Sequence, residues 1–373
     1  IASCLVGSEM CIRDRLVIDS ARLEVLIPLF NGEPFEVLSL RRESINVNLL
    51  IIINCLKYAI HEKNLRLSYA MAFIDHVNPS IVITFIDNNS FFHQLDARNN
   101  DENIKFIAIQ NGNRKFNGPI DLVTISSVDP KTIYHSNFFC FGEYEVDQYT
   151  KHGASVKNFY PCGSLIDSYY RSLPSHNNCE TFDICLVSNN WSSISTGTIF
   201  WELRQDYEQL LSYLRNFQLR NGKTIKVACQ SFPESEDYRK EIEWLQKYLG
   251  NDVEYVPKDT LNLASYSLTD HTIVVVGMHS TLLRESFGRK NKVLECNYSD
   301  SHYEILTTGI WLLNEQGYEI FEKQILELIA MDTDSYNELC REYSSYLIGY
   351  DEDKPTHTVI TEFIDDHINL MHN

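Results

Sequence analysis

The sequence lacks three features that would each indicate a class of protein: a surplus of basic residues, a long apolar run and paired cysteines. Its formal charge of −19 at pH 7 argues against binding to a nucleic-acid polymer, because such binding needs a basic surface. A membrane-spanning helix needs roughly 18 apolar residues in a row, and the nearest candidate, residues 47–56, is too short. No cysteines have the C-x-x-C spacing of zinc and redox sites, so a structural zinc ion is not expected.

Three common enzyme motifs are also missing. The chain has no G-x-G-x-x-G, no Walker A loop and no G-x-S-x-G, which disfavours a dehydrogenase, a kinase or a hydrolase. Residues 332–334 and 351–353 match the D-x-D pattern with which some glycosyltransferases hold a metal ion. Neither segment follows an expected strand, so we interpret both as helix caps and solvated charge. We therefore predict neither a metal ion nor a cofactor.

The ten cysteines favour a reducing compartment. Two of them fall in residues 4–14, which resemble the translation of a sequencing adapter, so residues 1–15 are predicted to be artefactual or disordered. The natural chain is then expected to begin near Leu16. The other eight often lie in apolar runs, as Cys140 and Cys185 do, which is typical of reduced core residues. A cytoplasmic protein is predicted, and a position at the inner face of the membrane stays open.

Length and composition predict two α/β domains. The chain has 373 residues, 44% of them hydrophobic, which is enough for two cores. Short apolar runs rich in β-branched residues alternate with helical patterns, which is typical of doubly wound parallel sheets. The predicted parts are an N-terminal Rossmann-like domain at 16–171, a linker at 172–181, a second Rossmann-like domain at 182–355 and a terminal helix at 356–373.

The most informative stretch is 272–295, which reads as strand, tight loop, helix and strand. A helix that starts at the carboxyl end of a buried strand offers free N–H groups and a positive dipole end, which suit a phosphate group. His279 lies at the loop tip, and Glu285 lies one turn into the helix, where it could accept hydrogen bonds from ribose hydroxyls. Ser280 or Thr281 can serve as the N-cap of this helix, and ordinary turn and capping chemistry would explain the same residues. The predicted donor-binding residues here are Gly277, His279, Ser280, Thr281 and Glu285.

In the first half, the expected strands 80–86 and 105–109 both end in clusters of small polar residues. The carboxyl ends of parallel strands share one edge of the sheet, where ligands bind in open α/β folds. We predict Asp87 as the base that deprotonates an acceptor hydroxyl, with His93 as the second candidate. The alternative is plain capping and turn formation, which Asn and Asp both favour. The other predicted acceptor-side residues are Asn88, Asn89, Gln110, Asn111 and Gly112.

Two patterns resemble known proteins. The strand ends VITFIDNN and KFIAIQNG resemble those of a bacterial family of surface carbohydrate biosynthesis proteins with a GT-B glycosyltransferase-like fold. The series Ser280-Thr281-x-x-x-Glu285 resembles the donor half of GT-B glycosyltransferases. The resemblance implies two Rossmann-like domains that face each other across a cleft, with the terminal helix 356–373 crossing back to the first domain.

The resemblance also implies roles for several loops. The loop after the expected strand 182–187 would face the donor phosphates with the backbone N–H groups of Ser188, Asn189 and Asn190. Gln230 follows a neighbouring strand and is predicted to lie on the donor side as well. The turn at Gly163 and Ser164 would lead into the interdomain hinge.

The predicted activity is transfer of a sugar from a nucleotide-sugar donor to a glycan or lipid-linked glycan acceptor, without a metal ion. Peripheral attachment to a membrane would fit a lipid-linked acceptor. Two alternatives stay open: a nucleotide-sugar epimerase on the same fold, and a non-catalytic protein that binds nucleotide sugars or glycans in an assembly complex. The sequence leaves the oligomeric state undetermined.

Overall fold

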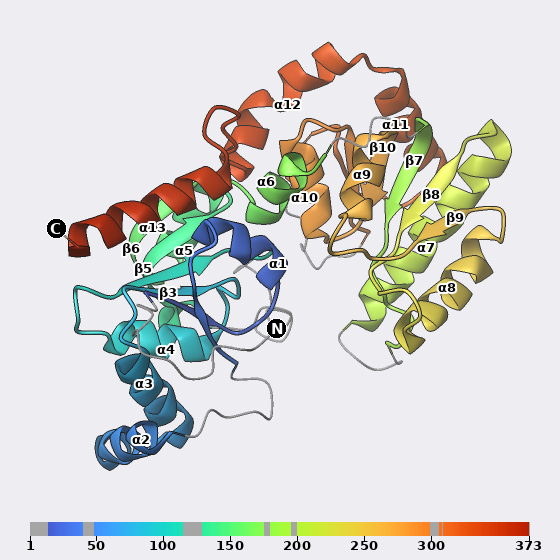
Figure 1. Ribbon diagram of the computed structural model, residues 1–373. Helices are drawn as coiled ribbons and strands as arrows, with labels where there is room; N and C mark the ends of the chain where they lie inside the picture. The colour runs from blue at the N-terminus through green and yellow to red at the C-terminus, as the bar shows by residue number, and fades with distance from the viewer. Residues whose placement is uncertain are drawn as a thin grey trace.

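The computed structural model describes residues 14–39, 48–114, 129–174, 180–194, 200–298, 306–307 and 309–372. These residues form two α/β domains, each built on a parallel sheet with helices on both faces (Figure 1). The predicted fold class, two Rossmann-like doubly wound domains of the GT-B type with C-terminal helices, is confirmed. Residues 1–13 of the segment 1–15, predicted above to be artefactual or disordered, and half of the predicted linker, 175–179, lie outside the described residues, while Arg15 is the first residue of a strand.

The N-terminal sheet has the strand order β2-β1-β3-β4-β5-β6, and every neighbouring pair is parallel. Every residue of β1 and β3 is buried, because helices cover both faces of the sheet. This burial explains why these strands read as continuous apolar runs. The strands are β1 (Arg15–Ile18), β2 (Glu36–Leu38), β3 (Ile81–Thr84), β4 (Lys105–Ile109), β5 (Tyr134–Cys140) and β6 (Ser155–Pro161).

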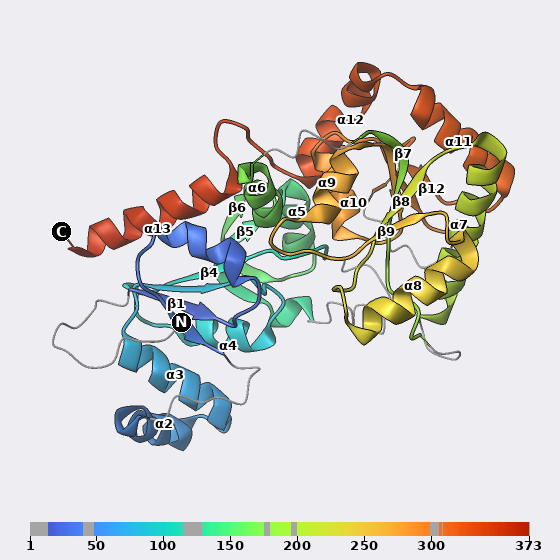
Figure 2. The same ribbon diagram turned by 45° about the vertical axis from the view of Figure 1, so that its right-hand side comes forward.

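Helices cover the two faces of this sheet unequally. One core joins the strands to α3, α4 and α5, with α2 lying outside α3, and the other joins them to α1, η1 and α6. The α2–α3 hairpin projects from the domain in both views (Figures 1 and 2). The helices are α1 (Leu23–Leu26), η1 (Ile27–Phe30), α2 (Leu49–His61), α3 (Leu65–Val77), α4 (Ser90–Arg98), η3 (Pro130–Thr132), α5 (Glu143–Lys151) and α6 (Leu165–Ser172).

The C-terminal sheet has the order β9-β8-β7-β10-β11-β12, again with parallel neighbours throughout. Numbered from its first strand, this order is 3-2-1-4-5-6, the Rossmann arrangement. The strand order therefore reverses between β7 and β10. The strands are β7 (Phe182–Val187), β8 (Ile225–Ala228), β9 (Glu254–Val256), β10 (Thr272–Gly277), β11 (Val293–Cys296) and β12 (Leu312–Leu313).

One large core unites the C-terminal sheet with most of its helices. The exception is α9, whose first residues pack into the core of the other domain through Leu263 and Tyr266. The helices are α7 (Trp201–Asn221), α8 (Glu236–Leu249), α9 (Ala264–Asp270), α10 (Thr281–Gly288), α11 (Tyr318–Ala330) and α12 (Thr333–Leu347).

The last helix, α13 (Thr356–His372), returns to the N-terminal domain (Figure 1). Ile360 and Ile364 lie in the core formed by β1, β3 and α6. The Thr356 hydroxyl donates to the Cys162 carbonyl at 2.6 Å, which fixes the start of the helix on the end of β6. Among the described helices, none is both long enough and apolar enough to cross a bilayer.

Candidate functional site

The carboxyl ends of the two sheets face each other where the domains meet. In the loop after β4, the Asn113 N–H donates to the Thr281 hydroxyl oxygen, at the start of α10, at 3.1 Å. A Cβ on Gly112 would lie 3.2 Å from the same oxygen, so this close approach favours glycine. Further along both sheets, Leu263 in the segment after β9 packs in the same core as Val25 and Leu26 of the segment after β1. The two edges therefore run side by side, with β4 opposite β10 and β1 opposite β9.

The reversal of strand order in each sheet marks where a ligand should bind. The order reverses between β1 and β3 in the first domain and between β7 and β10 in the second. Ligands of open α/β sheets bind beyond the carboxyl ends of the strands at such points. Val187 and Gly277, the last residues of β7 and β10, are paired in the sheet, and α10 begins four residues after Gly277. The helix start thus lies at the position that topology favours for a ligand.

The start of α10 has the cap that the sequence predicts. The Ser280 hydroxyl accepts the N–H of Leu282 at 3.3 Å, and His279 adopts the left-handed conformation with φ 50°. His279, Ser280 and Thr281 are half-buried. Gly277 is needed for space rather than for an unusual backbone angle, because an added Cβ would lie 3.2 Å from the Val187 carbonyl oxygen. These four residues stay the predicted phosphate-binding group.

The loop after β7 does not hold free N–H groups as predicted. Ser188 donates its N–H to the Ala228 carbonyl at 3.0 Å, and Asn189 donates its N–H to the Tyr207 hydroxyl at 3.3 Å. The Asn190 N–H donates to the Gln230 side chain at 2.7 Å. All three groups are therefore satisfied within the protein, which corrects the prediction that they face the donor phosphates.

A buried glutamate that the sequence did not single out organises these loops. Glu241, in α8, is fully buried and accepts the Ser188 hydroxyl at 2.6 Å. It also accepts the N–H groups of Gln230 at 2.9 Å and Ser231 at 3.0 Å. The Asn189 amide then donates to the Met278 carbonyl at 2.5 Å, which connects the loop after β10. The loops after β7, β8 and β10 thus form one hydrogen-bonded platform beneath the start of α10.

Asp87 is a buried structural carboxylate, not the exposed base predicted above. Its side chain is 0% exposed and pairs with Arg114 at 2.5 Å. It also accepts the Asn111 N–H at 3.0 Å and the Tyr149 hydroxyl at 3.4 Å. Because both carboxylate oxygens are occupied and closed to solvent, Asp87 fixes the loop after β4 instead of meeting an acceptor.

The other residues predicted to lie on the acceptor side are mostly buried in part or in full, and one of them caps a helix. Gln110 is buried; its amide donates to Glu145 at 3.0 Å, and its oxygen accepts the Phe141 N–H at 2.7 Å. Asn89 caps α4 by accepting the Phe91 N–H at 3.0 Å, as the alternative interpretation expected. Asn88 and Asn111 are half-buried, and the Asn111 oxygen accepts Arg114 at 2.6 Å. Of this predicted group, Gly112 is the residue that contacts the second domain.

His93 lies inside the N-terminal core and cannot meet an acceptor there. It is 1% exposed, and its ring centroid lies 4.7 Å from that of His135. Burial, together with the nearby Arg114, lowers the pKa of His93 to about 4. Burial also lowers the pKa of His135, with smaller effects of His93 and Arg114. Both histidines are therefore neutral at physiological pH, which corrects the prediction of His93 as a second base.

This burial predicts a loss of stability in acid. An unfolded histidine titrates near 6.5, so between that pH and about 4 the unfolded chain binds a proton at His93 that the folded chain does not. The free energy of unfolding should fall across this window by up to about 3 kcal/mol. Asp96, with its pKa raised to about 6 by burial, opposes the trend, so the comparison must be between variants. In urea unfolding at pH 7 and pH 4.5, His93→Gln should lose less stability than the wild type; equal losses would contradict the assignment.

Glu285 faces the domain interface and not a ribose. It is 2% exposed, and it accepts the hydroxyls of Ser164 and Tyr266, both at 2.5 Å. Burial, with the neighbouring Asp167, raises its pKa to about 7. One oxygen is thus used across the domains by Ser164 and the other within the second domain by Tyr266, which corrects the predicted ribose contact. Ser164 lies where α6 begins, so this one of the two predicted hinge residues directly contacts α10, while Gly163, at φ 94°, lies beside Thr356.

Two arginines, Arg284 within α10 and Arg289 at its C-terminal end, stabilise the same interface. Arg284 is 1% exposed and binds both oxygens of Glu145, in α5, at 2.7 and 2.8 Å, and it also donates to the Leu347 carbonyl. Arg289 binds Asp167, in α6, at 2.5 Å and Asp270 at 2.9 Å. Together with Thr281 and Glu285, these contacts bind α10 to the N-terminal domain along its length.

The structure also brings together two cations that the sequence did not single out. Arg22 follows β1 with φ 58° and is bound to Glu24 at 3.1 Å. Lys258 follows β9 and lies over the Phe232 ring at 5.1 Å. Burial lowers the pKa of Lys258, and Arg22 lowers it further. Glu241 and Glu24 act on Lys258 in the opposite direction, so the two cations are already partly neutralised within the protein. The signal in the sequence is only that each cation follows a strand end.

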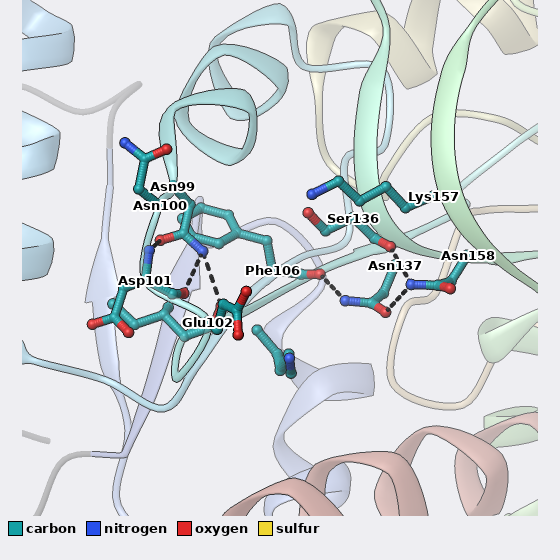
Figure 3. Close-up of a pocket in the computed structure, with 11 residues that line it drawn as sticks. Asn99, Asn100, Asp101, Glu102, Phe106, Ser136, Asn137, Lys157 and Asn158 are labelled. Atoms are coloured by element: carbon teal, nitrogen blue, oxygen red, sulfur yellow. Dashed lines mark hydrogen bonds between the residues drawn. The ribbon is translucent and has the colours of Figure 1, made fainter.

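A cavity of about 440 Å³ lies away from this edge, near the amino ends of β4, β5 and β6 (Figure 3). Figure 3 shows Asn99 to Glu102 on one side and Asn137 and Asn158 on the other. The Asn137 amide donates to the Phe106 carbonyl at 3.0 Å and the Asn158 amide to the Asn137 oxygen at 3.2 Å. These two amides are therefore bonded within the protein and do not themselves mark a ligand site.

Acidic residues do not gather into a metal site within the described residues. No group of three or more His, Cys, Asp or Glu side chains there is arranged to hold an ion. In the D-x-D segment 332–334, Asp332 caps α12 by accepting the Ser335 N–H at 2.8 Å. In the segment 351–353, Asp351 accepts the Asp353 N–H at 2.9 Å in an exposed turn. Asp332 thus has the capping role, and the exposed segment 351–353 has the solvated charge, that the sequence predicted.

Two Rossmann-like domains whose strand ends meet at one interface define a protein of the GT-B fold. The chain belongs to the family described as "putative O-antigen biosynthesis protein", whose model matches residues 107–360. This agrees with the predicted resemblance to surface carbohydrate biosynthesis proteins. A search of curated proteins finds no significant match.

Solved structures share the fold over nearly the whole chain. The S. aureus MnaA–UDP co-structure aligns with 96% of this chain and 96% of that chain, with a TM-score of 0.58 and 12% identity. The Methanocaldococcus jannaschii UDP-GlcNAc 2-epimerase in complex with UDP-GlcNAc and UDP aligns with 88% of this chain and 99% of that chain, with a TM-score of 0.50 and 11% identity. Identities this low show a common fold only.

Proposed function

We propose that the protein is a glycosyltransferase that moves a sugar from a nucleotide-sugar donor to a growing surface glycan. The observation that carries the proposal is the start of α10, which lies at the strand reversal of a Rossmann sheet and meets the loop after β4 of the other domain. A donor bound there would have its reacting end between the two domains. Membership of an O-antigen biosynthesis family supports a glycan acceptor.

The chemistry at this position suits a leaving nucleoside diphosphate. The positive end of α10 and the half-buried His279, Ser280 and Thr281 would bind the phosphates and stabilise the charge that develops as the glycosidic bond breaks. Arg22, which is paired with Glu24, and Lys258 lie at the far end of the same edge and would meet the other end of the donor. The donor would thus extend along the carboxyl ends of β10, β7, β8 and β9. We propose that this transfer proceeds without a metal ion.

A nucleotide-sugar epimerase is the second candidate, and whole-chain similarity to a UDP-GlcNAc 2-epimerase favours it. Such an enzyme would change the sugar without an acceptor. A non-catalytic binding protein is the third, favoured by the burial of Asp87 and His93, the two predicted bases.

One experiment separates the three candidates. The protein is titrated calorimetrically with UDP-, GDP-, CMP- and dTDP-sugars, and each mixture that gives heat is then analysed by mass spectrometry and NMR with and without a lipid-linked glycan acceptor. A transferase releases free nucleotide and lengthens the acceptor only when the acceptor is present. A changed sugar without acceptor indicates an epimerase, and heat without any product indicates a binding protein.

A further inference from the structure

Helix α2 exposes an apolar face that nothing in the described chain covers. Its inner side, with Ile51 and Cys55, is buried against α3. Its outer side carries six large apolar residues, with exposed fractions from 43% for Ile52 and Ile53 to 79% for Ile60. Figures 1 and 2 show α2 on the outer side of α3, away from both sheets. The exposed residues are Leu49, Leu50, Ile52, Ile53, Leu56 and Ile60, continued by Leu65 at the start of α3.

This face is larger than chance exposure explains. A helix that is apolar all round is normally buried on every side. The exposed fractions of these seven residues correspond to roughly 800 Å² of surface, above the roughly 300–600 Å² of the largest patch on a typical monomer. The same area matches the roughly 800 Å² that each partner buries in a standard protein interface.

The spacing of the exposed residues fits a second copy of the same helix. Leu49, Ile53, Leu56 and Ile60 follow at intervals of four, three and four, which is the a and d spacing of helices that pack along a seam. This series is the same when it is read backwards. An antiparallel copy therefore presents the identical pattern, as a twofold axis requires. Leu49 of one copy would face Ile60 of the other, and Ile53 would face Leu56.

The charge of the α2–α3 hairpin also favours a second copy of the chain as the partner of α2. Residues 48–78 carry Lys57, Lys63 and Arg66 against Glu62 and Asp75, a net +1, while the whole chain carries −19. Contact through this hairpin keeps the acidic bodies of two copies apart. An anionic membrane would instead repel most of the chain. The Lys57 stem, beside the seam, can cover apolar surface while its ammonium group stays in water.

We propose that α2 is the contact surface between two copies of this chain, which pack antiparallel about an axis between Ile53 and Leu56. The two α2–α3 hairpins then form a four-helix arrangement. This surface is remote from the carboxyl edges of the sheets, so the inference does not depend on the proposed function.

The test measures mass in solution. Full-length wild type is analysed by sedimentation equilibrium over a hundredfold range of concentration, beside Leu56→Glu/Ile60→Glu and the control Leu339→Glu. Leu339, in α12, is 58% exposed against 62% for Leu56, so it matches the change outside α2. Wild type and control should be dimers, and the dissociation constant of the α2 variant should rise at least a hundredfold with its circular dichroism unchanged.

Three outcomes would overturn the proposal. One is a monomeric wild type throughout the concentration range. Another is a dimer that the α2 substitutions leave intact. The third is a monomer that floats with vesicles of phosphatidylglycerol and phosphatidylethanolamine, with flotation lost in Leu56→Glu/Ile60→Glu, which would assign the face to a membrane.

Discussion

Replacing Arg284 by methionine is expected to lower the free energy of unfolding by about 3–5 kcal/mol, because it leaves a buried carboxylate without its counter-charge. Arg284 and Glu145 are both almost completely buried, and they join the two domains through two hydrogen bonds of 2.7 and 2.8 Å. Glu145 would keep the Gln110 amide and the Gly142 N–H as donors, which do not neutralise it. Chemical denaturation monitored by fluorescence measures the loss.

A double substitution separates the effect of the buried charge from the effect of packing. Arg284→Met/Glu145→Gln removes both charges and keeps an amide that can still bind Gly142. This double variant should regain most of the stability lost by Arg284→Met alone, because no unpaired charge stays buried. If the double variant is as unstable as the sum of the two single changes, the ion pair does not couple α10 to α5.

Replacing Asp87 by asparagine is expected to cost about 3–5 kcal/mol of stability as well, since the buried Arg114 loses its partner. Arg114 is held by Asp87 through two atoms, at 2.5 and 3.0 Å. A catalytic base on the surface would behave differently, because its replacement would abolish activity and leave stability nearly unchanged. Thermal unfolding of Asp87→Asn measures the effect.

The matched control is Asp353→Asn, which removes the same charge from an exposed turn. Its melting temperature should stay within a degree or so of the wild type, since isolated surface charges contribute little. A melting temperature of Asp87→Asn equal to that of the control would return Asp87 to the list of candidate bases.

The fold was predictable because the evidence for it is local. The runs 80–86 and 105–109 are apolar and short, and each is followed by polar residues, so strand, edge and neighbouring helix could all be inferred. The position of Ser280 as a cap was predictable for the same reason, because capping depends on residues only two or three apart.

The roles of several site residues were not predictable, because they depend on partners far away in sequence. Glu285 looked available to a ligand, but Ser164, 121 residues earlier, occupies it across the interface. Arg284 binds Glu145 at a separation of 139 residues. Hydrophobic periodicity indicates which side of a helix is buried but not which polar groups meet there. It therefore predicted helix α10 but not the polar contacts that α10 makes.

The proposed transferase activity requires above all that the start of α10 binds a phosphate. Thr281→Asp tests it directly, because an acidic residue in the first turn stabilises the helix while repelling a bound phosphate. Thr333→Asp, in the first turn of α12, adds the same charge at an exposed site and serves as the control. We would measure by calorimetry the dissociation constant of the nucleoside diphosphate that binds the wild type most tightly. The account predicts a constant weakened by about tenfold or more in Thr281→Asp and unchanged in Thr333→Asp; equal affinity in all three proteins would contradict it.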